Sequence, residues 1–377
     1  MSETLFWLAG ACLFYVYAGY PLLVWAAAAV RARPLSRASI LPSVSVLVSA
    51  HDEEARIDAR LQNLLALDYP RHRIEILLGS DGSTDGTVMR ARRYPDVTVV
   101  DFPTRRGKPA VLNDLARIAH GETLVMGDVR QRYEPDTVRA LVAPLAAPDV
   151  GAVSGELMLT EREEGGAVGC GVGFYWRYEK FIRMQESRLD STVGVTGAVY
   201  AVRRELFEAL PADAILDDVL LPMRIVRRGY RVVFEPAARA YDSAAATSGE
   251  EFTRKVRTIA GNFQLFARER WLLNPLRNRL WAQTVSHKML RLASPFFLLV
   301  AFAANTALLD VPMYRWTLAA QVLFYAAALG GYLLRDARRV PLLTVPYVFC
   351  LLNYATAVAF SRFLRRQQQV TWERASA

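Results

Sequence analysis

Polar side chains follow four apolar segments in the first half of the chain. These segments are rich in Val, Ile and Leu and alternate with helical patterns, which predicts strands of a parallel sheet covered on both faces. Ligands of such sheets bind beyond the carboxyl ends of the strands. One strand-end aspartate can be a simple helix cap, but four polar ends on one edge predict a ligand site. The residues concerned are His51 to Glu53, Asp81 to Ser83, Asp101 and Asp128.

Four charged residues have the chemistry to bind a nucleotide-linked sugar and activate a hydroxyl group. Asp81 can accept a hydrogen bond from a nucleobase N–H. Lys108, preceded by a glycine that lets the backbone approach a ligand, can balance phosphate charge. Asp128 offers the oxygen ligands that Mg²⁺ and Mn²⁺ take. Asp218, at the start of a predicted helix, is a candidate general base.

Two of these residues also have a simpler interpretation. Asp128 can be a helix cap, and Lys108 can be a solvated residue at the start of a helix. Asp217, next to the candidate base, is expected to be structural or to support the base rather than to act as the base. The residues alone therefore define a chemistry but not a unique site.

The second half of the soluble-looking region has a looser pattern. The stretch GCGVGFYWRYEKFIRMQES predicts a long helix, and VGVTGAVYAVRRELF is broken by glycine before it becomes extended. The stretch LDDVLLPMRIVRRGYRVVFEP predicts a helix followed by a strand. Strands and helices of this kind predict an α/β domain.

Long apolar stretches predict an integral membrane protein. The chain is 53% hydrophobic, with a mean hydropathy of +0.13. Stretches without Asp, Glu, Lys or Arg reach or approach the roughly 20 residues that cross a bilayer as a helix. They are Leu5–Val30, Leu292–Leu309, Trp316–Leu334 and Val340–Ser361.

The distribution of arginine predicts how the chain is oriented. No basic residue precedes the first apolar stretch, whereas Arg31, Arg33 and Arg37 follow it. The positive-inside rule then puts the N-terminus outside and the central domain in the cytoplasm, as a multi-pass protein of the cytoplasmic (inner) membrane. The first stretch is too long for a signal-peptide core, which favours an uncleaved anchor.

The last apolar stretch leaves two possibilities. If Val340–Ser361 crosses the membrane, the basic residues after it lie outside, against the charge rule. Two prolines within it make a re-entrant segment the alternative. Its length and apolarity favour a fourth crossing.

Net charge and cysteine content limit the kinds of binding partner that we expect. The net charge of +9 suits anionic lipid headgroups or a phosphorylated substrate. No zinc-finger spacing or RNA-binding motif accompanies this charge, so we expect no nucleic-acid partner. The three cysteines lack metal-ligand spacing and are expected to be packing residues; they are Cys12, Cys170 and Cys350.

The order of motifs resembles that of the family 2 glycosyltransferases. SVSVLVSAHDEEARIDARLQNLLALDYP followed by IEILLGSDGSTDGT is similar to the opening of the membrane-embedded branch, which contains cellulose, hyaluronan and poly-N-acetylglucosamine synthases. The likeness covers nearly the whole chain. It implies the GT-A fold, a mainly parallel, Rossmann-like sheet with flanking transmembrane helices. It also implies an inverting transfer from a nucleotide sugar, expected to be UDP-linked, with help from Mg²⁺ or Mn²⁺.

The resemblance assigns roles to particular residues. It places Ala50, Glu53 and Asp81 at the uridine and Lys108 at the nucleotide. The metal motif falls on Asp128 to Arg130. Asp128 and Arg130 are assigned to the donor side, with Asp128 as the metal ligand. The base motif makes Asp218 the catalytic base. Residues on the acceptor or diphosphate side are Gly197, in the loop Val195–Arg204, together with Asp217, Arg254 and Arg257.

Departures from the family pattern have consequences. The second carboxylate of the metal motif is replaced by Arg130, so metal binding depends on Asp128 and the diphosphate, and Arg130 partly substitutes for a cation. The motif typical of processive synthases aligns with Arg254 to Gly261, where Thr258 stands in place of its tryptophan. Since that tryptophan stacks on the acceptor sugar, its loss favours limited addition over long-chain polymerisation.

These observations predict a chain of five parts. They are a transmembrane helix (1–30), a cytosolic GT-A domain (40–267), an amphipathic interface helix (268–291), a C-terminal transmembrane region (292–361) and a basic tail (362–377). For 268–291, a solvated helix of the soluble domain is the alternative. The expected acceptor is a glycan or lipid-linked sugar at the cytoplasmic face, with partner subunits where a product is exported.

An alternative function uses the same fold without turnover. The replacement at Arg130 favours a catalytically silent glycan-binding or scaffold subunit of a polysaccharide assembly complex. The presence of Lys108 and Asp218 argues for the enzyme.

Overall fold

The computed structural model describes residues 1–160, 168–243, 248–334 and 340–367. These residues divide into two compact units. The sheet unit contains residues 31–160 and 186–243. The helical unit contains residues 1–30 and the described parts of 161–185 and 244–368.

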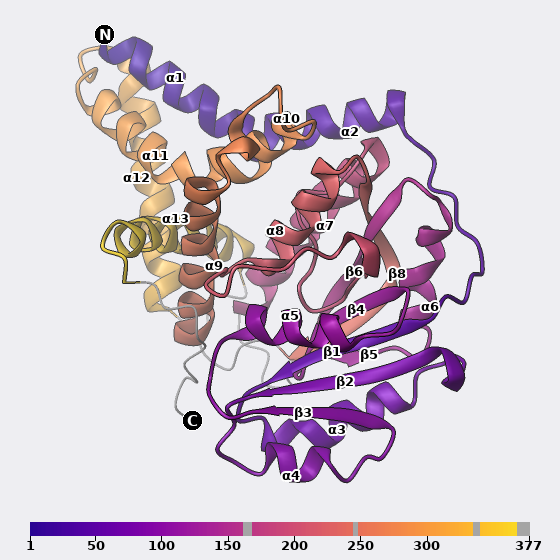
Figure 1. Cartoon of the computed structure of the whole chain (residues 1–377). Coiled ribbons are helices and arrows are strands. Elements are labelled where there is room, and N and C mark those ends of the chain that lie inside the picture. Colours follow the sequence, from indigo (N-terminus) through magenta and orange to yellow (C-terminus); the bar gives the residue numbers. More distant parts are fainter. Residues whose placement is uncertain (161–167, 244–247, 335–339, 368–377) are drawn as a thin grey trace. The chain divides into compact units, whose positions relative to one another are not determined.

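The sheet unit is built on a mixed sheet of eight strands in the order β3-β2-β1-β4-β7-β6-β8-β5 (Figure 1). The strands are β1 (Val44–Ala50), β2 (Ile74–Asp81), β3 (Val97–Phe102), β4 (Thr123–Asp128), β5 (Arg132–Tyr133), β6 (Val150–Thr160), β7 (Tyr200–Arg203) and β8 (Arg231–Ser243). The first four pair in parallel, as the sequence predicts. Strand β7 runs antiparallel between β4 and β6, which makes the sheet mixed.

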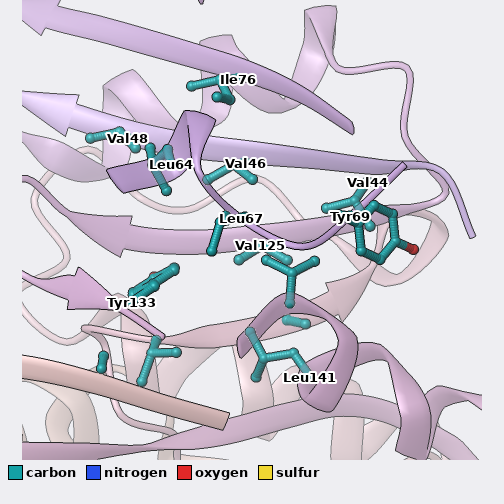
Figure 2. Close-up of a cluster of buried hydrophobic side chains, with 14 of the residues drawn as sticks. Val44, Val46, Val48, Leu64, Leu67, Tyr69, Ile76, Val125, Tyr133 and Leu141 are labelled. Carbon is teal, nitrogen blue, oxygen red and sulfur yellow. The ribbon is translucent and has the colours of Figure 1, made fainter. Parts of the chain in front are cut away.

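Helices between the parallel strands follow the predicted alternation. They are α3 (Glu54–Leu65), α4 (Thr87–Ala91), α5 (Lys108–Ile118) and α6 (Thr137–Val142), and α8 (Asp217–Arg227) precedes β8. The apolar face of α3 packs its Leu64 into a core with Val46 of β1, Val125 of β4 and Leu141 of α6 (Figure 2). Burial of this apolar surface from both sides explains why the inner strands read as continuous hydrophobic runs.

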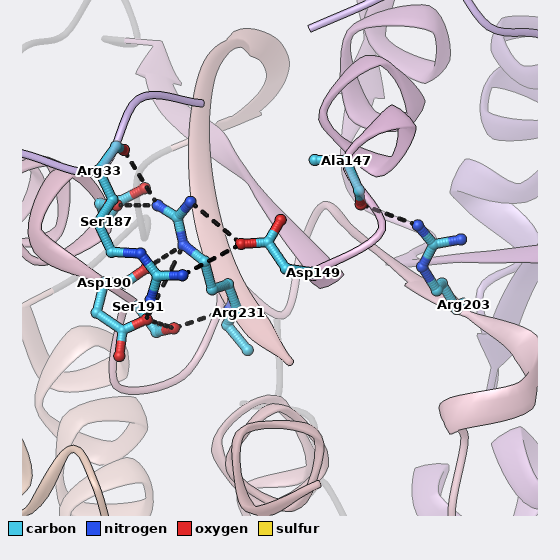
Figure 3. Close-up of polar contacts among 9 residues, drawn as sticks. Arg33, Ala147, Asp149, Ser187, Asp190, Ser191, Arg203 and Arg231 are labelled. Atoms are coloured by element: carbon cyan, nitrogen blue, oxygen red, sulfur yellow. Dashed lines mark hydrogen bonds and ion pairs between the residues drawn. The ribbon is translucent and has the colours of Figure 1, made fainter. Parts of the chain in front are cut away.

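An arginine on β8 fastens the segment that follows residue 31 to the sheet (Figure 3). Arg231 is 3% exposed. Its Nε donates to the carbonyl oxygen of Asp190 at 2.9 Å and its Nη2 to that of Ser187 at 3.1 Å. The Arg33 guanidinium reaches the carboxylates of Asp149 and Asp190 at 3.4 and 3.2 Å. Residue 33 and residues 187–190, all within the sheet unit, are therefore held together beside β8.

The helical unit contains, among the described residues, four helices long and apolar enough to cross a membrane. They are Ser2–Arg31, Trp281–Thr306, Pro312–Leu333 and Pro341–Leu364. Each corresponds to one predicted apolar stretch, including the last. The first comprises α1 (Ser2–Phe14), the π-helical turn Tyr15–Gly19 and α2 (Tyr20–Arg31). The second comprises α10 (Trp281–Gln283), the π-helical turn Thr284–Met289 and α11 (Leu290–Thr306), and the last two are α12 and α13.

Two further helices accompany these, α7 (Val168–Leu189) and α9 (Ser248–Arg268). Glu179 of α7 lies in a group of cations, with its carboxylate 3.1 Å from His287 Nε2 and 2.9 Å from Arg291 Nη1. Burial would raise the pKa of Glu179, but His287, Lys288 and Arg291 outweigh burial and hold the pKa well below its ordinary value. This carboxylate therefore ties α7 to the helix that begins at Trp281.

The structure corrects the expectation of one amphipathic helix over residues 268–291. Helix α9 ends at Arg268, a 3₁₀ turn covers Arg270–Leu273, and helix resumes only at Trp281. Pro275 disfavours a helical conformation at the residue before it. The Asn278 side chain donates to the Leu272 carbonyl at 2.8 Å and accepts from the Leu280 amide at 3.0 Å. These bonds fix a turn where the apolar pattern alone predicted a helix.

The unit limits differ from the predicted domain limits in one respect. Helix α9 groups with the apolar helices, although the sequence predicted it within the domain 40–267. The predicted basic tail begins within α13, which ends at Leu364, and residues 368–377 lie outside the described part of the chain. The functional meaning of these limits stays a prediction.

Candidate active site

The carboxyl ends of the parallel strands lie side by side on one edge of the sheet. Ala50 of β1 pairs with Ser80 of β2, and Ser49 of β1 pairs with Asp128 of β4. Asp81 is therefore one residue beyond the pair at the end of β1. The structure brings these predicted ligand-binding strand ends to one edge.

The loop after β1 is held by the polar residues of the GSTDGT segment. The Asp52 amide donates to Ser83 Oγ at 3.1 Å, and the Thr84 amide donates back to Asp52 Oδ1 at 2.8 Å. The Glu53 amide donates to Thr87 Oγ1 at 2.8 Å. Asp52 has a φ of 51°, a left-handed conformation that aspartate tolerates better than most residues. The two loops thus form one rigid rim at the carboxyl ends of β1 and β2.

Glu53 lies in this rim, and its carboxylate contacts a neighbour on α3. Arg56 Nη1 donates to Glu53 Oε2 at 3.0 Å. The side chain of Glu53 is 19% exposed. Its predicted contact with the nucleoside stays a prediction.

Asp81 anchors the loop that leads to Lys108. Its carboxylate accepts from the backbone amide of Arg106 at 2.6 Å and from that of Gly107 at 2.8 Å. Gly107 has a φ of 91°, which a side chain would make unfavourable. Because Lys108 is the next residue, this backbone bend sets the point where the lysine enters the site.

Lys108 is the centre of the charged group. Its Nζ lies 2.7 Å from Asp128 Oδ1 and 3.8 Å from Asp217 Oδ2. Burial alone would lower the pKa of Lys108, but the carboxylates of Asp128 and Asp217 outweigh burial and raise the pKa above its ordinary value. Lys108 is therefore a permanent cation over the physiological pH range.

Asp128 begins a tight turn formed by residues 128–131, here called the Asp128 turn. Its amide donates to Gln131 Oε1 at 3.1 Å, and Gln131 Nε2 donates to Asp242 Oδ2 at 3.0 Å. Arg130 Nη2 lies 3.7 Å from the same Asp242 oxygen. Burial would raise the pKa of Asp128, but Lys108, Arg130 and Arg60 outweigh it and lower the pKa. The Asp128 carboxylate is therefore ionised.

The two aspartates at the start of α8 face different surroundings. Asp217 is 6% exposed, and the Tyr200 hydroxyl donates to its Oδ2 at 3.5 Å. Burial, reinforced by Asp217, Asp218 and Asp128, raises the pKa of Tyr200 well above its ordinary value. Asp218 is half-buried. Asp217 thus faces inward to Lys108, and Asp218 is the more accessible carboxylate.

Gly197 lies directly against Asp218. A Cβ placed on Gly197 would come within 2.9 Å of Asp218 Oδ2. The Val195 amide donates to the Asp218 carbonyl at 2.8 Å. Residues 194–199, here called the Gly197 loop, therefore pack against the start of α8, and glycine leaves space beside the carboxylate.

The sequence predicted most members of this group but not all. Lys108, Asp128, Asp217 and Asp218 come together, as do the loops of Ala50, Glu53 and Asp81. Arg254 and Arg257 lie on α9 of the helical unit, and their diphosphate or acceptor roles stay predictions. Residues that the sequence did not single out are Arg60, Gln131, Tyr200 and Asp242.

A divalent cation fits these residues as a partner shared with phosphate. Within the described ranges, no group of three or more His, Cys, Asp or Glu side chains gathers to hold a metal ion. Mg²⁺ at phosphate sites is commonly held by one or two carboxylates together with phosphate oxygens. Asp128 supplies one such carboxylate, so a cation would be held by Asp128 and the ligand jointly.

Replacing Asp81 by asparagine tests its role as the loop anchor. The amide of asparagine has one acceptor oxygen and turns a donor toward a backbone N–H, which leaves a buried donor unpaired. We expect Asp81→Asn to weaken nucleotide binding about tenfold and to speed amide hydrogen exchange at residues 104–108. The control is Asp96→Asn in the turn before β3, where the side chain is exposed and belongs to no predicted ligand contact. Equal effects of both variants would contradict the anchor role.

Two family models match the chain. The model described as "Glycosyl transferase family 2" matches residues 45–210, which contain the Asp128 turn and Lys108. The model described as "Glycosyl transferase family group 2" matches residues 131–360, which is more than half of the chain. Together they cover the strands, the α8 carboxylates and three of the apolar helices.

Two curated relatives match a shared part. The protein named "Probable glycosyltransferase YdaM" of Bacillus subtilis (strain 168) is 27% identical over 244 residues, covering 59% of this chain and 56% of that protein. The "Poly-beta-1,6-N-acetyl-D-glucosamine synthase" of Staphylococcus aureus (strain COL) is 22% identical over 246 residues, 61% of this chain and 57% of that protein. The chain thus spans a little over half the length of these relatives.

A solved structure matches nearly the whole chain. It is the mannosyltransferase PcManGT from Pyrobaculum calidifontis in complex with GDP-Man and Mn²⁺. The TM-score is 0.72 with 26% identity, and the match covers 97% of this chain and 100% of that one. The fold is therefore the predicted GT-A fold with accompanying apolar helices. With the site geometry and both family models, this places the chain in the family 2 glycosyltransferases.

Proposed function

We propose that this enzyme transfers a sugar with inversion from a nucleotide-sugar donor, expected to be UDP-linked, to a hydroxyl group of a glycan or a lipid-linked acceptor. The observation that carries this proposal is the position of the Lys108 ammonium group, which lies close to the carboxylates of Asp128 and Asp217. Asp218 follows Asp217 directly on helix α8. A cation for the diphosphate and an accessible carboxylate for the acceptor are the two requirements of the reaction.

The donor would lie on the edge formed by β1, β2 and β4. Ala50 and Glu53 belong to the rim, and Asp81 lies at the end of β2. Lys108 and Arg130 would balance the diphosphate charge. A divalent cation, held by Asp128 and the phosphate oxygens, would supply further charge neutralisation on the leaving group.

The acceptor hydroxyl would be activated by Asp218. Its carboxylate takes the proton as the acceptor oxygen bonds to the anomeric carbon. The bond from that carbon to the diphosphate oxygen breaks on the opposite side, and the nucleoside diphosphate leaves with its electron pair. Asp217 keeps Lys108 oriented during this step, and Gly197 leaves room for the acceptor beside Asp218. Arg254 and Arg257 are proposed to contact the diphosphate or the acceptor.

An assay with several nucleotide sugars tests which nucleotide the donor carries. UDP follows from the motif resemblance, whereas the Pyrobaculum mannosyltransferase was solved with GDP-Man. The purified full-length chain in lipid nanodiscs should release nucleoside diphosphate from UDP-sugars, with or without acceptor, and Mn²⁺ should accelerate release relative to EDTA. Release from GDP-mannose alone would replace the UDP assignment. No release from any donor would favour a catalytically silent subunit and overturn the proposal.

The base assignment predicts a separation of binding from turnover. Asp218→Asn should lower kcat by about 10³-fold or more, because loss of a general base removes proton transfer in the transition state. Nucleoside diphosphate affinity, measured by calorimetry, should change less than about threefold, since Asp218 is not placed at the donor phosphates. The control Asp213→Asn replaces an exposed carboxylate of the preceding loop and should be neutral. Retained turnover in Asp218→Asn would refute the assignment.

The apolar helices support placement in a membrane, and we propose that the sheet unit faces the cytoplasm, where nucleotide sugars are made. Partner subunits would be needed where the product is exported.

The orientation is tested with single cysteines placed at Ser36 and at Asp310, in a variant without the native cysteines. Each cysteine reports on which side of the membrane its position lies. In intact cells a membrane-impermeant maleimide should label position 310 but not 36. Labelling of both, or of 36 alone, would contradict this orientation.

A further inference from the structure

Arg60 of α3 is a buried cation with little hydrogen bonding. It is 2% exposed. Its Nη1 donates to the Gln131 carbonyl at 2.8 Å and to Asn63 Oδ1 at 3.3 Å. Nε and Nη2 have no hydrogen-bond partner among the described residues. A buried charge with unsatisfied donors is costly, so its presence requires a compensating role.

The guanidinium of Arg60 lies on the ring of a fully buried tyrosine. The Arg60 Cζ atom is 4.1 Å from the centre of the Tyr133 ring, a cation–π contact in a desolvated setting. Asn63, one turn further along α3, receives a hydrogen bond from the Tyr133 amide at 2.7 Å and donates to its carbonyl at 2.8 Å. The tyrosine is thus clamped against α3 through its ring and its backbone.

The hydroxyl of Tyr133 reaches both strand β4 and the Gly197 loop. Its hydroxyl lies 2.9 Å from the Ala198 carbonyl and 3.3 Å from the Met126 carbonyl, and can donate to either. A Cβ on Gly127 would clash with this hydroxyl and come within 3.0 Å of Arg60 Nη2. Glycine at the end of β4 therefore lets the strand pack directly on the arginine–tyrosine pair.

These contacts join the two halves of the proposed site. On one side, Arg60 holds the Gln131 carbonyl, and so the Asp128 turn that faces the donor phosphates. On the other side, Tyr133 holds Ala198, which is the neighbour of Gly197 and belongs to the loop packed against Asp218. The path from the donor turn to the base is therefore made of buried contacts within the sheet unit.

We propose that Arg60 and Tyr133 form a strut that fixes the Asp128 turn relative to the Gly197 loop, which makes Arg60 a positioning residue for sugar transfer. The inference rests on the proposed function and adds a residue that touches neither donor nor acceptor. Its effect is geometric: a small displacement between donor and base is enough to lower the rate strongly.

The experiment compares three variants with a matched control. Arg60→Met removes the charge but keeps the length of the side chain, Arg60→Lys keeps a cation, and Tyr133→Phe removes only the hydroxyl. Arg139→Met is the control, because Arg139 also lies over a tyrosine, at 6.0 Å from the Tyr69 ring, but with a 36% exposed side chain. All are assayed as full-length protein in nanodiscs, well below the thermal midpoint measured for each.

The strut predicts a loss in kcat that exceeds the rise in donor KM. Arg60→Met and Tyr133→Phe should each lower kcat per folded molecule about tenfold or more, and Arg60→Lys should recover part of the loss. Arg139→Met should match the wild type. A purely stabilising arginine would lower the thermal midpoint of Arg60→Met and leave kcat of the folded enzyme unchanged, and that result would overturn the inference.

Amide hydrogen exchange decides the question independently of turnover. Arg60→Met should speed exchange at residues 126–131 and also at 196–199, whereas Arg139→Met should affect neither. Faster exchange confined to 126–131 would show that no coupling reaches the Gly197 loop and would also overturn the strut. A wild type inactive with every donor would refute the proposed function, and the exchange data would still test the strut.

Discussion

The ammonium group of Lys108 is the interaction on which the site depends. It is held by Asp128 from β4 and by Asp217 from α8, two elements far apart in the sequence. The side chain of Lys108 is only 14% exposed, and a cation removed from water to this extent is tolerated only with carboxylates at close range. Its position in turn requires the bend at Gly107 and the two backbone hydrogen bonds to Asp81. Sheet, loop and helix are therefore specified together by one charge.

The same edge of the sheet shows how short polar motifs act as structural parts. The hydroxyl groups of Ser83 and Thr87 accept hydrogen bonds from the backbone amides of residues 52 and 53. Thr84 donates to the Asp52 carboxylate through its amide and its hydroxyl group. Short hydroxyl and carboxylate side chains disfavour helices because they compete for the backbone hydrogen bonds, and the same property makes them suitable in such loops. The result is a rim whose shape exists before any ligand arrives, which lowers the ordering cost of binding.

Local patterns predicted the sheet edge well and the long-range contacts poorly. Apolar strands such as Val44–Ala50 and their polar ends are visible in the sequence. The parallel half of the sheet, and the positions of Asp81 and Asp128 at strand ends, could therefore be predicted. The insertion of β7 between β4 and β6 has no local signature, because it depends on which edge a later segment meets. In the sequence, Arg60 has the pattern of an ordinary surface residue of an amphipathic helix. In the structure its guanidinium is buried on the ring of Tyr133, which lies seventy-three residues later in the chain. The break after Leu273 is set by Pro275 and by the side-chain bonds of Asn278, and hydrophobic periodicity reports neither of them.

The pairing of Lys108 with Asp128 implies a competition at the moment of ligand entry. A phosphate that approaches the ammonium must displace or share a carboxylate already 2.7 Å away. A small inorganic anion gains little from that exchange, because it brings no other contacts to offset the loss. A ligand that also engages the rim near Glu53 and the end of β2 does gain. If the proposed donor site is correct, this competition would favour whole nucleotide sugars over abundant cellular phosphate.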